Sequence, residues 1–382
     1  MGQPRIPCGG PSPHGGANTV TIEPLLVSAT RRHDRHRVNI GAVEVGGDRV
    51  PVIAGPCAVE TGYVDHAIAA QRAGASVLRG CVLKPRTRPG SFQGLGVAGL
   101  PLLDEARRVT GLPVIAEPLA TGDVELLRDH ADALLIGARS MHNTPLLRAA
   151  GQSGMTVILK RGMSATYDEW LAASEYITAE GNRQVILCER GIRTFETATR
   201  NTLDVSAIAV LRDMTDLPIA VDPSHAAGNA RWVPSLAVAA LAAGADALLI
   251  ECHPDPASSL CDAAQAITPG VLGRIVQTSL ALCAMTRPAV AESVTGCRAM
   301  IDTIDDAVFQ MLEYRAAMVE AVQQRKLAAL LPERDLDRER EIVDRLSRRA
   351  PRLGEHRVGR LVHAIIDECL DAVPVCSEAA VA

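Results

Sequence analysis

Short runs of apolar residues recur along the chain from residue 50 onward, and each is followed by an amphipathic or alanine-rich stretch. A short continuous apolar run is typical of a buried parallel strand, and the stretches between the runs are long enough for helices. Eight such pairs predict an α/β fold, a (β/α)8 TIM barrel, whereas a doubly wound sheet would more usually have fewer strands. The runs are VPVIAG (50–55), SVLRG (76–80), LPVIAEP (112–118), ADALLIG (131–137), MTVILKRG (155–162), RQVILCERG (183–191), LPIAVDPSH (217–225) and ADALLIECH (245–253).

The chain before the barrel has a different composition. Residues 1–36 begin with a stretch rich in Gly and Pro that has little to bury, so we expect a disordered or extended segment. Two apolar triplets at 38–40 and 43–45, split by Gly41, predict a small hairpin that leads into the barrel. The barrel domain is therefore expected to span residues 37–285.

The pattern changes again after the eighth strand. Residues 286–296 contain Pro, Gly and small side chains and are expected to form a linker. Apolar residues then recur at helical spacing, which predicts an all-α domain at 297–374 with helices to about 326, at 336–349 and at 355–372, before a tail at 375–382. Three helices make a thin domain that needs a partner chain to cover its apolar faces, so we expect a homo-oligomer, a dimer or a tetramer.

Composition narrows the class of protein. The 382 residues are 47% hydrophobic, which is ample for buried cores, and the net charge of -5 argues against binding to nucleic acid. Ten cysteines occur without CxxC spacing, as expected of reduced thiols. No apolar run reaches the roughly 18 residues that a membrane span requires. We therefore expect a cytoplasmic protein that binds neither membranes nor nucleic acid.

Polar side chains gather at one end of the predicted strands, at or just past the carboxyl end of each apolar run. In a barrel these ends face one mouth, so residues far apart in the sequence would converge there. Ionisable groups scattered through a core without a shared mouth would be costly to bury. These residues are Cys57, Arg79, Lys84, Glu117, Arg139, Lys160, Arg190, Asp222, His225 and Glu251.

Cationic side chains are especially dense in the segment 78–96, LRGCVLKPRTRPGSFQGLG. Taken alone, this segment has the alternative of a basic surface loop. Cations crowded at the end of a buried strand repel one another unless an anion offsets them, which favours a phosphorylated substrate. The whole set exceeds what one phosphate needs and predicts two phosphates, or a phosphate and a carboxylate: Arg79, Lys84, Arg86, Arg139, Lys160 and Arg190.

A second set at the mouth has the chemistry of metal ligands. Cys57, His225, Glu251 and Asp262 provide a thiolate, an imidazole and two carboxylates, which suit Mn²⁺, Fe²⁺, Co²⁺ or Zn²⁺. A buried structural thiol is the alternative for Cys57 by itself. Together with a histidine and a glutamate at strand ends, the cysteine predicts a divalent metal site.

Seven motifs resemble, in order and spacing, those of the type I beta 3-deoxy-D-arabino-heptulosonate 7-phosphate (DAHP) synthases. The resemblance covers nearly all of residues 37–285 and implies condensation of phosphoenolpyruvate with erythrose 4-phosphate, in the pathway to the aromatic amino acids. The motifs are AGPCAVE (54–60), RGCVLKPRTRPGSFQGLG (79–96), IGAR (136–139), LKRG (159–162), CERGIRTFE (188–196), DPSHAAG (222–228) and ECHPDP with CDAAQ (251–265).

The resemblance also implies a role for each matching residue. The metal ligands would be the cysteine, histidine and two acidic residues named above, and Lys84 would lie between the two substrates. Arg86 and Thr87, in the KPRT motif, would hold erythrose 4-phosphate. A related barrel enzyme that makes 3-deoxy-octulosonate 8-phosphate from arabinose 5-phosphate is the alternative, although KPRT is the erythrose-phosphate signature. Phosphoenolpyruvate would be held by Arg79, Arg139, Lys160 and Arg190.

The helical segment resembles a second family, the all-helical AroQ class of chorismate mutases, which convert chorismate to prephenate. Any one of its charges has the alternative of an ordinary solvated helix residue. The pattern implies that Arg298 is donated to the active site of a neighbouring subunit and that Glu339 binds the hydroxyl of chorismate. The matching residues are Arg298, Arg315, Lys326, Asp335, Arg338 and Glu339, of which Arg315, Lys326 and Arg338 would grip the carboxylates and ether oxygen.

The last helix departs from that family. Cys369 and Val373 stand nearest to the positions where the family has a serine and then a glutamine or glutamate, and valine cannot donate a hydrogen bond. We therefore expect a bifunctional enzyme, with a chiefly regulatory module that binds prephenate or chorismate as the alternative for the helical domain. Fusion of the two activities suggests allosteric feedback on the barrel as a hypothesis.

Overall fold

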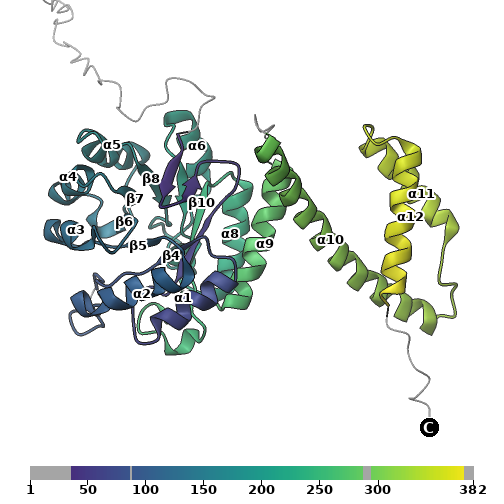
Figure 1. The fold of residues 1–382 in the computed structure, drawn as a ribbon, viewed down its shortest axis with the longest axis horizontal. Coiled ribbons are helices and arrows are strands. Elements are labelled where there is room, and N and C mark those ends of the chain that lie inside the picture. The colour runs from purple at the N-terminus through teal and green to yellow at the C-terminus, as the bar shows by residue number, and fades with distance from the viewer. Residues whose placement is uncertain (1–35, 87, 287–293, 374–382) are drawn as a thin grey trace, which may run out of the picture.

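The computed structural model describes residues 36–86, 88–286 and 294–373. The expected segment 1–36, apart from its last residue, therefore lies outside the described residues, as does the tail at 375–382. Within the described part, eight parallel strands close into a barrel in the order β10-β3-β4-β5-β6-β7-β8-β9, which confirms the predicted fold (Figure 1). The strands are β3 (Val52–Gly55), β4 (Val77–Arg79), β5 (Val114–Ala116), β6 (Ala133–Ile136), β7 (Thr156–Lys160), β8 (Val185–Glu189), β9 (Ile219–Val221) and β10 (Ala247–Glu251).

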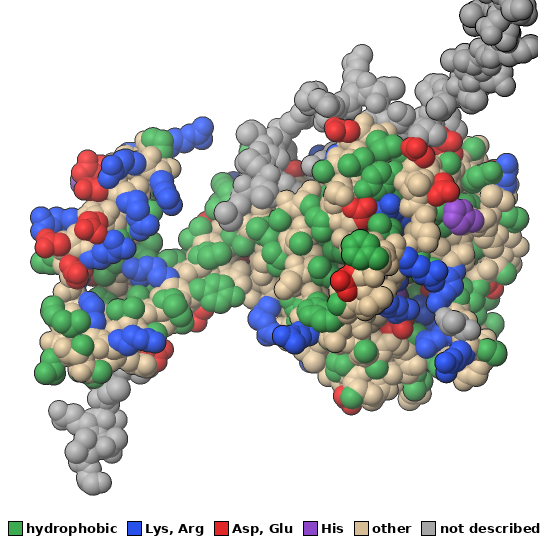
Figure 2. Space-filling view, turned by 180° about the vertical axis from the view of Figure 1, so that it is seen from behind, with side chains coloured by type: hydrophobic (Ala, Val, Ile, Leu, Met, Phe, Trp, Pro, Cys, Tyr) green, Lys and Arg blue, Asp and Glu red, His purple; other side chains and the backbone are tan. Residues whose placement is uncertain are grey.

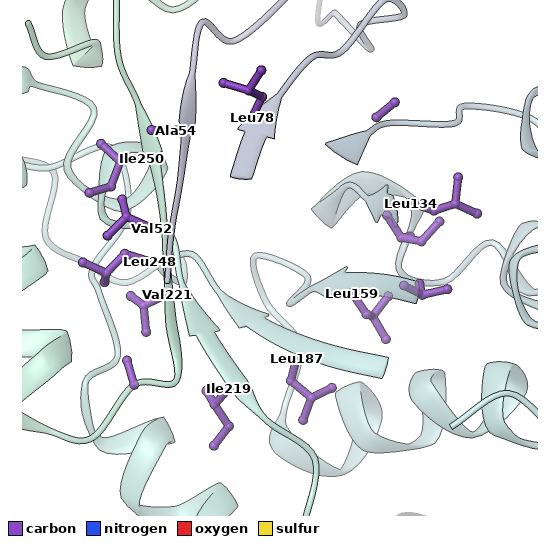
Figure 3. Close-up of a cluster of buried hydrophobic side chains, with 14 of the residues drawn as sticks. Val52, Ala54, Leu78, Leu134, Leu159, Leu187, Ile219, Val221, Leu248 and Ile250 are labelled. Atoms are coloured by element: carbon purple, nitrogen blue, oxygen red, sulfur yellow. The ribbon is translucent and has the colours of Figure 1, made fainter. Parts of the chain in front are cut away.

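Helices surround the barrel, as the alternating pattern predicts. Side chains alternate along each strand: in β6, Ala133 and Leu135 belong to the cluster inside the barrel, while Leu134 and Ile136 pack outward toward the helices. Figure 3 shows part of this outer layer. The helices are α1 (Tyr63–Arg72), α2 (Leu100–Thr110), α3 (Thr121–Leu127), α4 (Thr144–Gln152), α5 (Tyr167–Thr178), α6 (Ser206–Met214), α7 (Pro223–Ala227), α8 (Val233–Ala242) and α9 (Pro269–Thr286), with short 3-10 turns at η1 (Gly96–Gly99), η2 (Ala138–Ser140), η3 (Ala230–Trp232), η4 (Pro256–Ser258) and η5 (Ala263–Gln265).

The predicted hairpin is present and closes the amino-terminal end of the barrel. It pairs β1 (Val38–Ile40) with β2 (Val43–Val45) in antiparallel fashion. Val38, Ile40 and Val45 are fully buried in the same cluster as the side chains inside the barrel. The hydroxyl of Thr156, at the start of β7, donates a hydrogen bond of 2.6 Å to the carbonyl of Asn39. With this end plugged, the carboxyl ends of the strands form the accessible mouth.

The three predicted helices of the C-terminal region are α10 (Val294–Ala328), α11 (Leu336–Arg349) and α12 (Glu355–Asp371). The long helix α10 packs against α9 near its start and against α12 farther along, and α11 packs against α12 (Figure 1). None of the helices in the described ranges is both long and apolar enough to cross a membrane. Large apolar side chains of α10 are exposed, and Figure 2 shows hydrophobic side chains along this connecting helix: Ile301, Val308, Phe309, Met311 and Met318 are each more than 45% exposed.

Candidate active site

Strand ends and the loops that follow them hold the candidate residues at the mouth. Arg79 ends β4, Lys160 ends β7 and Glu251 ends β10. Cys57 follows β3, and His225 lies in the short helix α7 after β9. Because parallel strands of a barrel end at one rim, the closed sheet brings these distant segments together.

Four side chains with metal-ligand chemistry meet at this rim. One potential ligand atom from each of Cys57, His225, Glu251 and Asp262 lies within 4.8 Å of the others. The Sγ of Cys57 is 3.2 Å from Oδ2 of Asp262, and Nε2 of His225 is 3.4 Å from Oε1 of Glu251. Atoms that share one ion at about 2.0–2.3 Å lie at most about 4.6 Å apart. The four atoms therefore have nearly the spacing that a single ion requires.

One carboxylate oxygen of this group is buried without a hydrogen bond. It is Oε1 of Glu251, which has Nη1 of Arg79 at 3.1 Å as an ion-pair partner, whereas Nδ1 of His225 faces Oδ2 of Asp222 at 2.8 Å. An unsatisfied buried carboxylate oxygen is costly unless a cation or a donor reaches it. The residues present thus suit a divalent cation in both ligand type and unmet bonding capacity.

A cavity of about 260 Å³ opens beside these four residues. Its walls include His225 and Asp262, so an ion held by them would face the space where a substrate binds. The predicted cations of the cavity differ in burial. Lys84, Lys160 and Arg190 are buried, Arg86 is half-buried, and Arg139 is exposed at the rim. Five predicted cations line the cavity: Lys84, Arg86, Arg139, Lys160 and Arg190.

Buried carboxylates compensate the two lysines. Nζ of Lys84 donates to Oε2 of Glu117 at 2.9 Å, and Nζ of Lys160 donates to Oδ2 of Asp222 at 2.5 Å. Burial tends to raise the pKa of the Glu117 carboxyl, but the nearby ammonium of Lys84 outweighs it and the pKa is lowered. For Lys84, burial tends to lower the pKa of the ammonium, but the neighbouring acidic groups, Glu117 among them, outweigh it and the pKa is raised.

The surroundings of Arg79 differ from the phosphate-binding position expected for it. This side chain is fully buried and is not part of the cavity wall. Its Nη1 faces Glu251, and its Nη2 donates to Sγ of Cys57 at 3.7 Å. Arg79 thus lies behind two candidate metal ligands. Thr87, the other residue of the segment with an expected role, lies outside the described residues.

Arg200 is a cavity residue that the sequence pattern did not single out. It lines the cavity, and its Nη1 donates to Oδ1 of Asp262 at 3.2 Å and to Oε1 of Gln265 at 2.9 Å. Gln265 in turn donates to Oε2 of Glu251 at 2.7 Å. Arg200 lies in an irregular loop after β8, where no periodic signal marks an inward-facing side chain; Gln265 was visible only as the last residue of the CDAAQ motif.

The helical region carries a second cavity, of about 240 Å³, between α10, α11 and α12. Nζ of Lys326 donates to the carbonyl of Glu333 at 2.8 Å. Arg338 lines this space but is also paired with Glu341 at 2.8 Å on the exposed surface. Arg298 is exposed near the start of α10 and is not among the lining residues of its own chain. The predicted residues on its wall are Arg315, Lys326, Asp335, Arg338 and Glu339.

Two features of the second cavity were not anticipated. Arg334 holds the carboxylate of Glu339 through two hydrogen bonds of 2.9 and 2.8 Å and also reaches Asp367 at 2.8 Å. These hydrogen bonds from Arg334 lower the pKa of the Glu339 carboxyl. Cys369 is buried and does not line the cavity, where α12 instead presents Ile366 and Leu370. The apolar face of α12 thus lies where the AroQ resemblance implied polar groups.

Comparisons with known proteins agree with both halves of this architecture. The model of the DAHP synthetase I family matches residues 28–285, more than half of the chain. The chain belongs to the DAHP synthetase I family. The model of chorismate mutase type II matches residues 297–372. The protein therefore contains a DAHP synthase domain followed by a chorismate mutase domain, which favours the bifunctional interpretation over a purely regulatory helical module.

Individual relatives place the barrel in the same family. A phospho-2-dehydro-3-deoxyheptonate aldolase of Thermotoga maritima is 44% identical over 254 residues, covering 66% of this chain and 75% of that protein. A crystal structure of the Thermotoga maritima DAHP synthase superposes with a TM-score of 0.63 at 43% identity, covering 66% of this chain and 74% of that one. A 2-dehydro-3-deoxyphosphooctonate aldolase of Syntrophotalea carbinolica is 31% identical, covering 65% of this chain and 97% of that protein.

The buried pair at Lys160 generates a prediction about stability. Replacing Asp222→Asn removes the carboxylate that faces this ammonium at 2.5 Å, so we expect the free energy of unfolding of the barrel to fall by about 3–5 kcal/mol. Glu44→Gln at the exposed pair with Arg37 is the control and should change it by less than about 1 kcal/mol. Denaturant unfolding followed by circular dichroism measures both. Equal losses in the two variants would contradict an anchoring role for Asp222.

Proposed function

We propose that the barrel condenses phosphoenolpyruvate with erythrose 4-phosphate, consuming one water, to give DAHP and phosphate: a C–C bond forms between the enol carbon and the aldehyde carbon, and the oxygen of water takes the place of the phosphate that leaves. The observation that carries this proposal is the shared cavity, in which a cluster of metal-ligand side chains adjoins seven cationic residues, five of them predicted from the sequence. These cations exceed what one phosphate needs but suit two phosphates and a carboxylate. The family match of the barrel supports the same reaction.

A divalent ion, Mn²⁺, Fe²⁺, Co²⁺ or Zn²⁺, completes this site in our proposal. Cys57, His225, Glu251 and Asp262 would hold it, because their ligand atoms cluster and one buried carboxylate oxygen lacks a hydrogen bond. When bound, the ion supplies Lewis-acid polarisation of the aldehyde oxygen of the sugar phosphate.

The side chains of the cavity divide the work of holding the two substrates. Lys160 and Arg190 are buried deep in the cavity and would neutralise the phosphate and carboxylate of phosphoenolpyruvate. Arg139 reaches from the rim to the carbonyl of Pro85 at 3.3 Å, beside Arg86, so erythrose 4-phosphate would bind nearer the opening with Arg86 and Thr87. Lys84 lies within the same cavity wall and would contact both substrates. Holding the enol carbon against the aldehyde carbon in this way lowers the entropic cost of bringing two anions together in the geometry that reacts.

A substrate assay tests this assignment. Protein stripped of metal with a chelator is expected to form no DAHP, and one of the four ions should restore the rate, whereas Cys57→Ala should not recover with any of them because it lacks a ligand. With phosphoenolpyruvate present, erythrose 4-phosphate should be used at least about tenfold better than arabinose 5-phosphate, measured as kcat/KM.

Prephenate formation in the same samples is the control. Among the residues that the structure describes, the second cavity holds no group of candidate metal ligands, so the chelator should leave this rate unchanged. Preference for arabinose 5-phosphate would instead support the octulosonate alternative, to which relatives of about 31% identity belong.

In the helical domain we propose that a second copy of the chain completes each chorismate site. Arg315, Lys326 and Glu339 line the cavity of their own chain, whereas Arg298 is exposed outside it. The rearrangement of chorismate breaks its ether C–O bond and forms a C–C bond within the same molecule, so no covalent bond to the protein is needed. Cations would bind its carboxylates and ether oxygen, and ionised Glu339 would accept a hydrogen bond from its hydroxyl. The exposed apolar side chains along α10 support assembly into a homo-oligomer, a dimer or a tetramer.

Complementation between inactive variants tests the shared site. Arg298→Ala and Lys326→Ala should each lower the rate of prephenate formation by at least about 100-fold, since each removes a cation that stabilises the transition state. Mixing the two variants and allowing the subunits to exchange should restore about a quarter of the wild-type rate, because each mixed dimer has one intact site. No recovery, with exchange verified by native mass spectrometry of differently tagged chains, would mean that Arg298 acts within its own chain or not at all.

Feedback from the helical domain to the barrel is a further part of the proposal. We expect prephenate or chorismate to lower the rate of DAHP formation by the full chain, because occupation of one domain of a fusion can bias the other through shared packing such as that between α9 and α10. The rate is measured with and without each compound, and Lys326→Ala is the matched control because it weakens effector binding. An unchanged rate with both compounds would exclude this coupling.

The free, buried cysteines of the described residues support a reducing, cytoplasmic setting.

A further inference from the structure

A buried carboxylate outside the cavity connects two loops at the mouth of the barrel. Glu60 is 4% exposed and lies on the loop between β3 and α1. Its Oε1 is 2.7 Å from Nε2 of His253, and its Oε2 accepts a hydrogen bond of 2.9 Å from the backbone N–H of Leu260. Neither contact involves a residue that lines the substrate cavity. The cost of burying this carboxylate is therefore offset by hydrogen bonds within the protein and does not require a bound substrate.

The hydrogen bonds of His253 decide which of its nitrogens carries the proton. The backbone N–H of Asp255 donates to Nδ1 at 3.0 Å, so Nδ1 is unprotonated. The proton of the neutral imidazole is therefore on Nε2, which donates it to Glu60. Glu60 thus accepts two hydrogen bonds from the connection between β10 and α9, one from each side of the short turn η4.

This proton placement also excludes a competing role for the group. Glu60, His66 and His253 together offer ligand atoms within 4.8 Å of one another, a spacing compatible with a second ion. A metal would need the lone pair of Nε2 on His253, which the tautomer set by Asp255 does not provide. The nearest nitrogen of His66 lies 4.0 Å from Glu60, beyond hydrogen-bond distance. Glu60, His253 and the backbone N–H of Leu260 therefore form a structural brace, a set of hydrogen bonds that holds the loops together.

Each attachment of this brace is close in sequence to a candidate metal ligand. Glu60 follows Cys57 by three residues, His253 follows Glu251 by two, and Leu260 precedes Asp262 by two. Asp262 has φ of 55°, a left-handed conformation that a non-glycine residue adopts only when its surroundings hold it there.

We propose that Glu60 is a positioning residue that holds the segments carrying Cys57, Glu251 and Asp262 in register and thereby sets the affinity of the site for its ion. The inference rests on the metal site proposed above. The fourth candidate ligand, His225, is positioned separately, because Asp222 lies 2.8 Å from its Nδ1 and accepts its backbone N–H. Within the described residues Glu60 has no hydrogen bond to a candidate ligand, so its effect passes through the backbone of these segments.

Glu60→Gln is the sharpest test because it keeps the shape of the side chain. An amide has one acceptor oxygen and a donor group, so it cannot accept from both His253 and Leu260. We expect the dissociation constant for Co²⁺ to rise by about 10–100-fold, measured on the metal-free full chain by competition with a chromophoric chelator.

Asp246→Asn is the matched control, because Asp246 is an equally buried carboxylate that accepts from Arg212 and Ile219 at the opposite end of the barrel. It should leave the constant within about twofold.

Two variants of His253 provide an independent test if Glu60→Gln does not fold. His253→Gln can accept from Asp255 and still donate to Glu60, so it should bind Co²⁺ about as tightly as the wild type. His253→Leu can do neither and should lose affinity by about the same factor as Glu60→Gln. Far-UV circular dichroism and denaturant unfolding report whether the barrel of each variant is folded.

The outcomes separate this inference from the metal proposal. If Cys57→Ala weakens Co²⁺ binding but Glu60→Gln and His253→Leu do not, the site stands and the brace is wrong. If Cys57→Ala binds Co²⁺ as tightly as the wild type, the proposed metal site itself is wrong, and the brace with it. Equal weakening by Asp246→Asn would show that the effect is general loss of barrel stability and would also overturn the brace.

Discussion

Charged side chains are costly to bury unless an opposite charge or a hydrogen-bond partner lies within about 3 Å, and this barrel buries many of them at one end. Lys84 faces Glu117, Lys160 faces Asp222, and Arg79 faces Glu251. Each pair joins side chains from different strands or from the segments that follow them, so the assembled barrel is what brings the partners together. The same pairs hold two lysines at the cavity wall, where anionic substrates would bind. Structure and function at the mouth therefore depend on one set of ion pairs.

The two ends of the barrel are built from different interactions. At the amino-terminal end the hairpin covers the strands with Val38, Ile40 and Val45, which pack against the side chains inside the barrel. At the carboxyl end polar side chains replace apolar ones, and loops are tied together by buried carboxylates such as Glu60. A rigid apolar plug at one end thus supports a polar site at the other, in keeping with the general division of stability and function between the two ends of such barrels.

The helical domain relies on a different physical solution. Its three helices leave many apolar side chains of α10 exposed, and its cavity lacks the one predicted cation that lies near the start of that helix. Burying this face against a second copy would supply both stability and Arg298, so assembly and catalysis would be coupled. Because α10 also packs on α9 of the barrel, the same helix touches both domains and the proposed interface. This makes it the natural route for any coupling between the two activities.

Hydrophobic periodicity alone determined the architecture: eight buried strands, the small hairpin and three C-terminal helices all lie where the pattern predicts them. Motifs identified Cys57, His225, Glu251 and Asp262 as one group, and the closed barrel brings them together. Only the tertiary structure decided that Arg79 lies behind these ligands, that Arg200 lines the cavity, that Arg334 holds Glu339 and that Glu60 joins two loops. The reason is physical. Periodicity records which face of an element is buried, whereas contacts between irregular loops depend on barrel closure and strand register, which no local pattern encodes.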